Sequence, residues 1–284
     1  MNRPDTVRLQ TWLKATGFDP GMIDGIIGPN TIAASARYLL VDHSDESVAQ
    51  HAFDRLVGSR HAPYVHGIDV SGYQGKINWK KVATSGLCSF AIVKVTEGST
   101  HRQRSAQRNL DGARAWRIPV GGYHYAHPNT GRKNPKDAQR EAENFVSHYG
   151  TPQPDDLIPW IDAESGLIKS SAYHSFNVDW ILQFAETIKK EMGCGVGIYT
   201  ARWAIQSRLS KADNLDELAK KFPLWFAEYR SEKTENPRKK MAPWEQGSQM
   251  IWQWTGHGRV PGIKGDCDRN KATMADIVKL RMFT

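Results

Sequence analysis

Cysteine is scarce in this sequence, and its placement argues against two kinds of site. The 284 residues include three cysteines, with no Cys-x-x-Cys spacing among them. An odd and widely separated set suits neither a disulfide framework nor a zinc site. Because unpaired cysteine is usually buried, we expect Cys88, Cys194 and Cys267 to be buried free thiols.

Long apolar runs are also missing. A membrane span needs about 20 apolar residues, and the chain has no such run. Its first residues, MNRPDTVRLQTWLK, lack the apolar stretch of roughly 7 to 15 residues that a secretory signal contains. We therefore expect a soluble globular protein, made in the cytoplasm without a signal peptide and without stable membrane association.

Acidic residues are outnumbered, but only in one part of the chain. The net charge is +8; residues 1–57 carry five Lys or Arg against seven Asp or Glu, whereas the rest carries 33 against 23. A basic excess suits an anionic polymer such as cell wall or nucleic acid, although ordinary solvated surface is the simpler explanation for any one cluster. The basic clusters at 102–108 and 238–240 lack the interleaved aromatics of a nucleic-acid-binding stripe, so we expect no nucleic-acid partner.

Helical periodicity characterises the first 57 residues. Apolar residues recur at spacings of three and four in 9–13 and 32–39, a glycine-rich stretch separates the two, and a third helical pattern runs from Val48 to Leu56. We predict a small all-α domain of three helices over residues 1–57. The periodicity is lost in 58–65, which we interpret as a linker.

From residue 66 onward the pattern changes to short β-branched and aromatic runs separated by longer segments. Eight such strand candidates in one chain predict a closed parallel barrel. They occupy residues 67–71, 90–96, 120–127, 158–164, 196–201, 224–229, 251–256 and 266–270.

The connectors indicate that the barrel is irregular. Helical segments fit at 105–117, 136–149 and 177–191, whereas 230–250 is polar and contains two prolines. Residues 257–265 are too few for a parallel crossover, which needs about a dozen. We predict an α/β fold over residues 66–284, an irregular TIM-like barrel of eight strands and about five helices.

Asp162 and Glu164 follow the apolar run IPWI. Residues two apart on a strand point to the same face, so both carboxylates would project at the carboxyl-terminal mouth of the barrel, where barrel enzymes carry their chemistry. An isolated Asp-x-Glu is a weak signal, because such triplets are usually solvated surface. The signal is stronger here because Asp69, Glu97 and Asp268 end or enter other strand candidates.

Aromatic residues lie beside the same strand ends, and flat rings suit a carbohydrate. Core packing is the alternative for each of them. The candidate substrate-binding residues are Glu97 with Tyr73, Tyr123, Tyr125, Tyr199, Trp225, Trp252 and Trp254.

Several motifs in a fixed order are more specific than any one of them. HGIDVSGYQG, FAIVKVTEG, GGYHYAH, WIDAE, GIYT, PLWFAEY and WQWT...GDCDRN resemble the motif set of the Chalaropsis-type lysozymes, family 25 of the glycoside hydrolases. The resemblance covers nearly all of residues 66–284. It implies an endolysin-like N-acetylmuramidase that cleaves the β-1,4 bond between N-acetylmuramic acid and N-acetylglucosamine in peptidoglycan. Glu164 matches the catalytic acid, and Asp69, Asp162 and Asp268 match the supporting acids.

The roles of these acids follow from glycosidase chemistry. A general acid must hold its proton near neutral pH, which burial beside other carboxylates achieves by raising its pKa. Glu164 fits this role if Asp162 and Asp268 stay ionised. The partner is either a covalent nucleophile or a group that steers the substrate's own acetamido oxygen, and we favour the second, with Asp162 holding the amide. Asp266 lies two residues before Asp268, and the Asp-x-Asn pattern favours Asp268.

Residues 9–39 resemble a peptidoglycan-binding helical domain. The resemblance rests on the pattern LQ...L...GF...DGIIGPNT and implies wall binding by the loop that contains Asp24, Gly25, Gly28 and Thr31. A purely structural loop is the other interpretation, since glycines allow a tight turn. A binding domain placed first, without a signal peptide, suggests a phage lysis enzyme that a holin-like pore releases to the wall, in the periplasm or outside the cell.

Two alternatives compete with an enzyme. A catalytically silent wall-binding protein is the first, and the presence of all four acids together argues against it. Nucleic-acid binding by the basic clusters is the second, and their lack of interleaved aromatics argues against it. A metal site is not expected either, because His124 and His127 have no third ligand at a recognised spacing, so we expect no metal and no cofactor. We expect a monomer whose partner is bacterial peptidoglycan.

Overall fold

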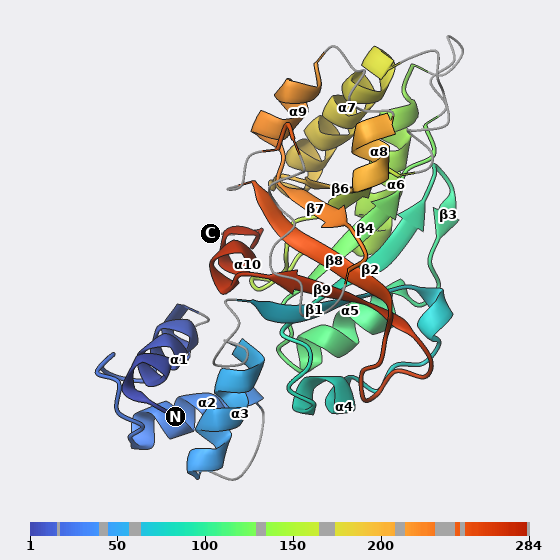
Figure 1. Cartoon of the computed structure of the whole chain (residues 1–284). Coiled ribbons are helices and arrows are strands. Elements are labelled where there is room, and N and C mark those ends of the chain that lie inside the picture. Colours follow the sequence, from blue (N-terminus) through green and yellow to red (C-terminus); the bar gives the residue numbers. More distant parts are fainter. Residues whose placement is uncertain are drawn as a thin grey trace.

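The computed structural model describes residues 1–15, 18–39, 45–56, 64–128, 135–164, 174–207, 214–230, 242–244 and 248–282. It consists of a helical N-terminal region beside a barrel (Figure 1). Most of the expected linker, Gly17 and the basic cluster at 238–240 lie outside the described residues. No helix within the described ranges is long and apolar enough to cross a bilayer.

The N-terminal region contains the three predicted helices: α1 (Arg3–Ala15), α2 (Pro29–Leu39) and α3 (Glu46–Leu56). Pro29 begins α2, where its missing N–H has no helical partner to lose. The apolar faces meet in one core that includes Leu9, Leu13 and Phe53. This core is separate from the core of the barrel.

Eight strands close the barrel, as the sequence predicts. Their order around it is β1-β9-β8-β7-β6-β5-β4-β2, and pairing of β1 with β2 completes the circle. A ninth short strand, β3 (His101–Arg102), pairs with the end of β2. The barrel strands are β1 (Val65–Val70), β2 (Phe90–Glu97), β4 (Val120–Tyr125), β5 (Trp160–Asp162), β6 (Gly197–Ala201), β7 (Leu224–Ala227), β8 (Gln249–Gly258) and β9 (Cys267–Ala272).

The direction of the last strand corrects the expectation of an all-parallel barrel. β9 is antiparallel to both β8 and β1. The reason is the short connection after β8, which can return the chain only as a hairpin-like turn. As a result β9 begins, rather than ends, at the mouth of the barrel, and Asp268 lies opposite Asp69.

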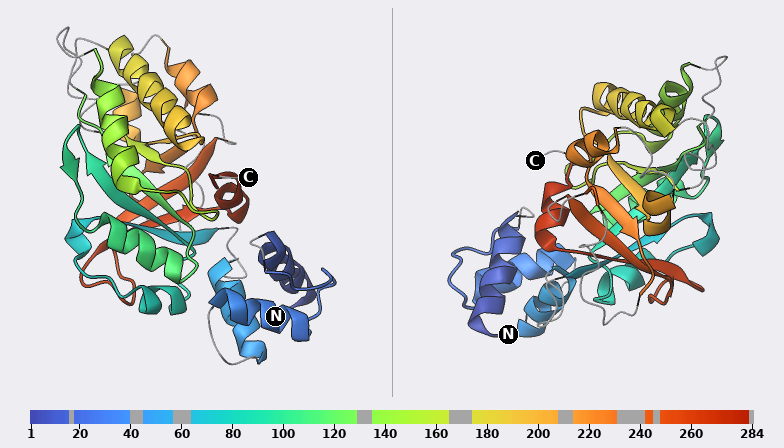
Figure 2. Two further views of the ribbon diagram at one scale, coloured as in Figure 1. Left: turned by 180° about the vertical axis from the view of Figure 1, so that it is seen from behind. Right: turned by 45° about the horizontal axis from the view of Figure 1, so that its top comes forward.

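Seven α-helices belong to the described part of the barrel, compared with the five or so expected. The long ones, α5 (Ala106–Ala115), α6 (Asp137–Tyr149) and α7 (His174–Met192), match the predicted segments and lie along the outside of the barrel (Figure 2). Four have only six or seven residues, too few to show a clear periodicity. These are α4 (Trp79–Thr84), α8 (Arg202–Ser207), α9 (Leu215–Lys221) and α10 (Met274–Lys279).

The cysteine prediction is confirmed, since Cys88, Cys194 and Cys267 are free and buried. Burial raises the pKa of the Cys194 thiol to about 11 and that of Cys267 to about 12. Both thiols therefore remain protonated and unreactive near neutral pH.

The helical region contacts the barrel at the end opposite its mouth. The Arg117 guanidinium lies 4.8 Å from the centre of the Phe18 ring, and Met274 packs against the helical core. Arg117 precedes β4 and Met274 follows β9, so both lie where the parallel strands begin.

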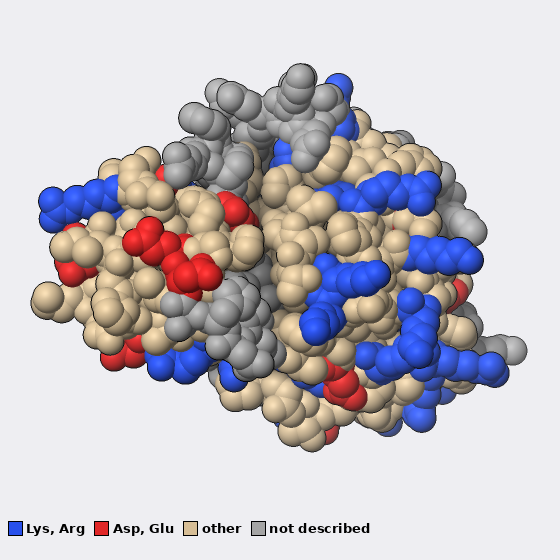
Figure 3. Space-filling view, turned by 90° about the horizontal axis from the view of Figure 1, so that it is seen from below, with Lys and Arg blue, Asp and Glu red and all other residues tan. Residues whose placement is uncertain are grey.

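The view from below shows Lys and Arg gathered over the barrel, in agreement with its basic excess (Figure 3).

Candidate active site

Asp162 ends β5 and points into the barrel. Side chains two apart on a strand share a face, so Asp162 lies above Trp160, whose ring packs against Trp225 at 5.8 Å. Gly197 makes room for the Trp160 ring, because a Cβ at that position would lie 2.2 Å from it. Asp162 is 6% exposed, and its Oδ1 has no hydrogen-bond partner among the described residues. A buried, unpaired acceptor therefore lies next to Glu164.

Asp69 and Asp268 form the opposite side of the site. They are direct partners in the pairing of β1 with β9, so their side chains share a face. Gln253 Nε2 and Asn270 Nδ2 donate to Asp69 Oδ2 at 3.0 and 2.8 Å. Three strands thus fix one carboxylate, and Asp268 stands beside it.

The four acids influence one another's ionisation. Burial raises the pKa of Asp69 to about 6, even though Gln253 and Asn270 lower it, and burial together with the Asp69 charge raises the pKa of Asp268 to about 8. Burial and the Glu164 charge raise the pKa of Asp162 well above its usual range, and burial raises that of Glu164. In the ligand-free site, burial and the neighbouring carboxylates therefore favour the protonated form of Asp162 and of Asp268, whereas from the sequence we expected both to stay ionised.

Replacing Asp268 with Asn is expected to flatten the pH dependence of thermal stability. Asp268 has a pKa of about 8 in the fold, against 3.8 for the ordinary group. Its proton therefore stabilises the fold fully below about pH 4, and this contribution is lost as the pH rises through about 8. When the pH is raised from about 5 to about 9, the Tm of the wild type should fall further than the Tm of Asp268→Asn. Each kcal/mol of free energy of unfolding lost by the wild type alone should add about 2–4 °C to this difference. A greater loss in the variant would refute the raised pKa.

Three predicted aromatics surround these acids. Burial raises the pKa of Tyr123 well above its usual range, and the charges of Asp69 and Asp162 add to the effect, so this phenol lies among the carboxyls. Tyr199 donates its O–H to Gln253 Oε1 at 2.9 Å, and Trp225 donates its indole N–H to Asn270 Oδ1 at 2.8 Å. Tyr199 and Trp225 therefore position Gln253 and Asn270, which in turn donate hydrogen bonds to Asp69.

Trp252 is placed differently from the prediction. It is 2% exposed, stacks on Phe226 at 6.4 Å and donates its N–H to the Glu228 carbonyl. The Lys271 ammonium lies 5.3 Å from the rings of both Trp252 and Trp254. Residues alternate along β8, so these two indoles point away from the barrel interior that Gln253 faces. We correct the expectation that they contact substrate, because they pack the outer face of β8.

Glu97 belongs to a charged group at the rim. Lys94 Nζ lies 2.6 Å from its Oε2, and His127 Nε2 lies 3.0 Å from its Oε1. Burial raises the pKa of Glu97, but the Lys94 hydrogen bond and charge outweigh this and lower it overall. The same ammonium lies 4.8 Å from the Tyr125 ring. Tyr73 follows β1 on a single 3-10 turn and is 96% exposed.

His124 faces the outer helices. Its Nδ1 lies 2.8 Å from Thr96 Oγ1, its Nε2 lies 2.6 Å from Glu141 Oε2, and burial lowers its pKa. It therefore fastens β4 to α6. Within the described ranges, no group of three or more His, Cys, Asp or Glu side chains is placed to hold a metal ion.

A cavity of about 510 Å³ opens beside Glu164, between β6, α8 and the end of β7. Its size is within the range of ligand pockets. Its lining includes Tyr199, Arg202, Trp203, Glu228 and Tyr229.

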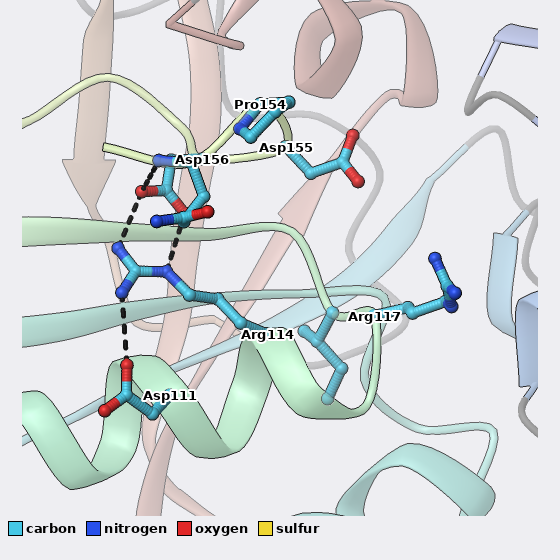
Figure 4. A pocket seen from close by; sticks show the side chains of 8 residues that line it. Asp111, Arg114, Arg117, Pro154, Asp155 and Asp156 are labelled. Carbon is cyan, nitrogen blue, oxygen red and sulfur yellow. Dashed lines mark hydrogen bonds and ion pairs between the residues drawn. The ribbon is translucent and has the colours of Figure 1, made fainter. Parts of the chain in front are cut away.

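A second cavity, of about 310 Å³, is separate from the acids. Figure 4 shows Arg114 on its wall between Asp111 and Asp156. Arg114 Nη2 lies 2.7 Å from the buried Asp156, whose other neighbours include the Tyr149 hydroxyl at 2.8 Å. These side chains connect α5 to the loop before β5, so we assign them a structural role.

Comparison with known proteins agrees with this geometry. The sequence profile of glycosyl hydrolases family 25 matches residues 68–263. The chain belongs to this family.

Two curated relatives and one solved structure illustrate the similarity. Lysozyme M1 of Streptomyces globisporus is 31% identical over 224 residues, which cover 77% of this chain and 71% of that protein. The autolytic lysozyme of Clostridium acetobutylicum is 31% identical over 202 residues, or 71% of this chain and 54% of that one. The crystal structure of the bacterial lysozyme from Streptomyces coelicolor has a TM-score of 0.64 at 29% identity, covering 76% of this chain and 96% of that one. The resemblance stated from the motifs is confirmed.

Some residues of this family 25 site escaped the sequence analysis. Gln253 lies between two tryptophans, and strict alternation along the strand would have placed it inward. Gly256 keeps space free, because a Cβ there would lie 3.2 Å from Asp268 Oδ1 and 3.1 Å from Tyr229 Oη. Arg202 and Glu228 gave no separate signal, because a charged residue after a strand is common.

The expected wall-binding loop of the N-terminal region is held from inside. Buried Gln10 donates to Asp24 Oδ1 at 2.9 Å and to Thr31 Oγ1 at 3.1 Å, and the Gly25 N–H donates to Gln10 Oε1. Gly25 has φ +77, and a Cβ there would meet Arg3, so glycine is required, whereas Gly28 has open space around it. Asp24, Gly25 and Thr31 thus set the shape of the loop.

Proposed function

We propose that this family 25 glycoside hydrolase is a muramidase that cuts peptidoglycan at the β-1,4 bond between N-acetylmuramic acid and N-acetylglucosamine. One observation carries the proposal: Asp162 at the end of β5 and Glu164, two residues beyond it, meet Asp69 and Asp268 on the opposite side of a barrel mouth. Such paired acids are the apparatus of glycoside hydrolysis. The names of the relatives, which are lysozymes, support it.

Glu164 is the proposed general acid. Burial raises its pKa, which keeps a transferable proton on it at higher pH than for an ordinary glutamate. It protonates the glycosidic oxygen as the bond to the anomeric carbon breaks, and the resulting carboxylate then removes a proton from the attacking water.

Asp162 is proposed to orient the muramyl acetamido group. Its unpaired Oδ1 can accept the amide N–H, which turns the amide oxygen toward the anomeric carbon. Leaving a buried acceptor unpaired costs about 1–3 kcal/mol, so substrate binding relieves a penalty that the free enzyme carries. Asp69, fixed by Gln253 and Asn270, and Asp268 complete the electrostatic surroundings.

The decisive experiment for the function is digestion of purified peptidoglycan followed by analysis of the new ends. New reducing N-acetylmuramic acid ends are expected. Freed amines would mean an amidase or peptidase, and binding without any new ends would favour the silent wall-binding alternative, which the retained acids do not favour.

Removing the helical region is expected to separate wall binding from catalysis. We infer two domains, with wall binding in residues 1–57, because each has its own core and their contacts lie at the end opposite the acids. A chain that starts at Gly58 should keep its activity on soluble glycan but bind wall less. Sedimentation with insoluble peptidoglycan measures this. Sedimentation equal to that of the full chain would contradict the anchor role.

The proposed partner is peptidoglycan alone, with the enzyme acting on the wall as a monomer, without nucleic acid or stable membrane association. The basic excess of the barrel supports attraction to an anionic wall. Release from a host cell by a lysis pore remains part of the same proposal.

A further inference from the structure

The cavity beside Glu164 contains a charged group that the acid chemistry does not use. Glu228 follows β7 and is 8% exposed at its side chain. Its Oε1 accepts from Arg202 Nη1 and, at 2.6 Å, from Arg230 Nη2. Two guanidinium groups therefore converge on one buried oxygen, and the three side chains together carry one net positive charge.

Arg202 is the member best placed to meet a ligand. It begins α8, lines the cavity and is 21% exposed, compared with 50% for Arg230. Its bond to Glu228 uses one nitrogen, so among the described residues Nε and Nη2 have no protein partner. These donors form one side of a planar fork that matches a carboxylate. A partly buried guanidinium with an open side is a built anion site rather than free surface charge.

Two exposed aromatics flank this fork. Trp203 is 56% exposed and Tyr229 is 58% exposed, and both line the same cavity. Exposed rings of this size suit the apolar face of a sugar. The backbone beneath is rigid, because Glu228 N–H donates to the Gln253 carbonyl and Arg230 N–H to the Trp254 carbonyl.

We propose that Arg202, positioned by Glu228, binds a carboxylate carried by the muramyl part of the substrate, while Trp203 and Tyr229 hold the neighbouring sugar face. This rests on the proposed function and specifies one of its binding subsites. Muramic acid carries a lactyl group, which is a free carboxylate in bare glycan and bears a peptide with its own carboxylates in intact wall. Both sources present the same chemistry to the fork.

Glu228 acts in this subsite as a positioning residue. Its charge is already matched by two arginines, and its second oxygen, Oε2, is buried with no hydrogen-bond partner in the part of the chain that the structure describes. It therefore orients the guanidinium and leaves a positive surplus for the substrate anion.

The test compares KM and kcat on three soluble glycans: peptide-bearing chains, peptide-stripped chains, and stripped chains whose carboxylates are converted to neutral amides. For wild type, the KM on the amidated glycan is expected to be about 10- to 100-fold higher than the KM on whichever carboxylate-bearing glycan has the lower KM, with similar kcat. The ranking of the first two identifies the source of the carboxylate. Arg202→Gln should lose the preference, and Lys189→Gln, which removes one exposed charge elsewhere, should keep it.

Glu228→Gln should weaken the preference through KM rather than kcat. If Arg202→Gln unfolds below the assay temperature, Arg202→Lys decides, because it keeps the charge but loses the fork and should still lose most of the preference. Equal KM values on all three glycans, or a preference that survives in Arg202→Lys, would overturn the subsite. Failure to cut any of the glycans would instead overturn the proposed function, and calorimetric binding of the same three glycans would still decide the role of Arg202.

Discussion

Glu164→Gln is expected to lower kcat on peptidoglycan by about 100- to 10,000-fold, the usual contribution of a general acid. The amide keeps the shape of the side chain but has no proton to give to the leaving oxygen. Glu164 is half-buried at the edge of the cavity, and burial is the cause of its raised pKa. The fold should therefore survive the change.

A matched control exists on the outer surface. Glu143 on α6 is exposed and, among the described residues, accepts a side-chain hydrogen bond only from Gln139 of the same helix, so Glu143→Gln makes the same chemical change away from the site. Turnover measured by reducing-end release should be unaffected in Glu143→Gln. Turnover like that of wild type in a folded Glu164→Gln protein would end the assignment of Glu164 as the acid.

The pH profile gives an independent view of the same acids. Because the pKa values of Glu164 and Asp268 are raised, these groups lose their protons at higher pH than ordinary carboxyl groups do. Activity should therefore fall as the pH rises through the range in which they ionise. Asp69 ionises before Asp268, since its pKa is raised only to about 6. The two hydrogen bonds that Asp69 accepts are the physical reason for this order.

The barrel and its acids are predictable from local patterns. Apolar runs of β-branched and aromatic residues mark the strands, and an acid at the end of such a run belongs at the mouth. Asp162 is the clearest case, because it directly follows the apolar run IPWI and ends β5, whereas Glu164 lies two residues beyond the strand. The long helices α5 to α7 were predictable for the same reason.

The features that the sequence patterns did not predict are mostly contacts between residues far apart in the sequence. The bonds from Gln253 and Asn270 to Asp69 join residues 184 and 201 positions apart. The antiparallel direction of β9 depends on which strand it closes against, and so does the pairing that brings Asp268 to Asp69. Trp252 looked like a sugar platform because aromatic composition does not reveal which face of a strand is inside. The convergence of Arg202 and Arg230 on Glu228 required the fold itself.

Peptidoglycan whose muramic acid residues lack the N-acetyl group is expected to be cut far more slowly, even where it still binds. In the proposed mechanism the acetamido oxygen attacks the anomeric carbon while Glu164 protonates the departing oxygen, and Asp162 holds the amide N–H. The configuration is then retained without a bond between sugar and enzyme. Asp162→Asn should also lower kcat, by about 100- to 1,000-fold, as expected for one group that stabilises developing charge.

The experiment that separates the two mechanisms compares kcat on acetylated and de-N-acetylated glycan under saturating conditions, with mass spectrometry of trapped enzyme alongside. A carboxylate nucleophile would tolerate loss of the acetyl group, because the amide would then contribute to binding and not to bond formation. Substrate assistance requires that group for the first bond, so the loss should appear in kcat rather than in KM. Equal rates, or a covalent glycosyl adduct on Asp162 or Asp268, would overturn the substrate-assisted mechanism while leaving the muramidase activity in place.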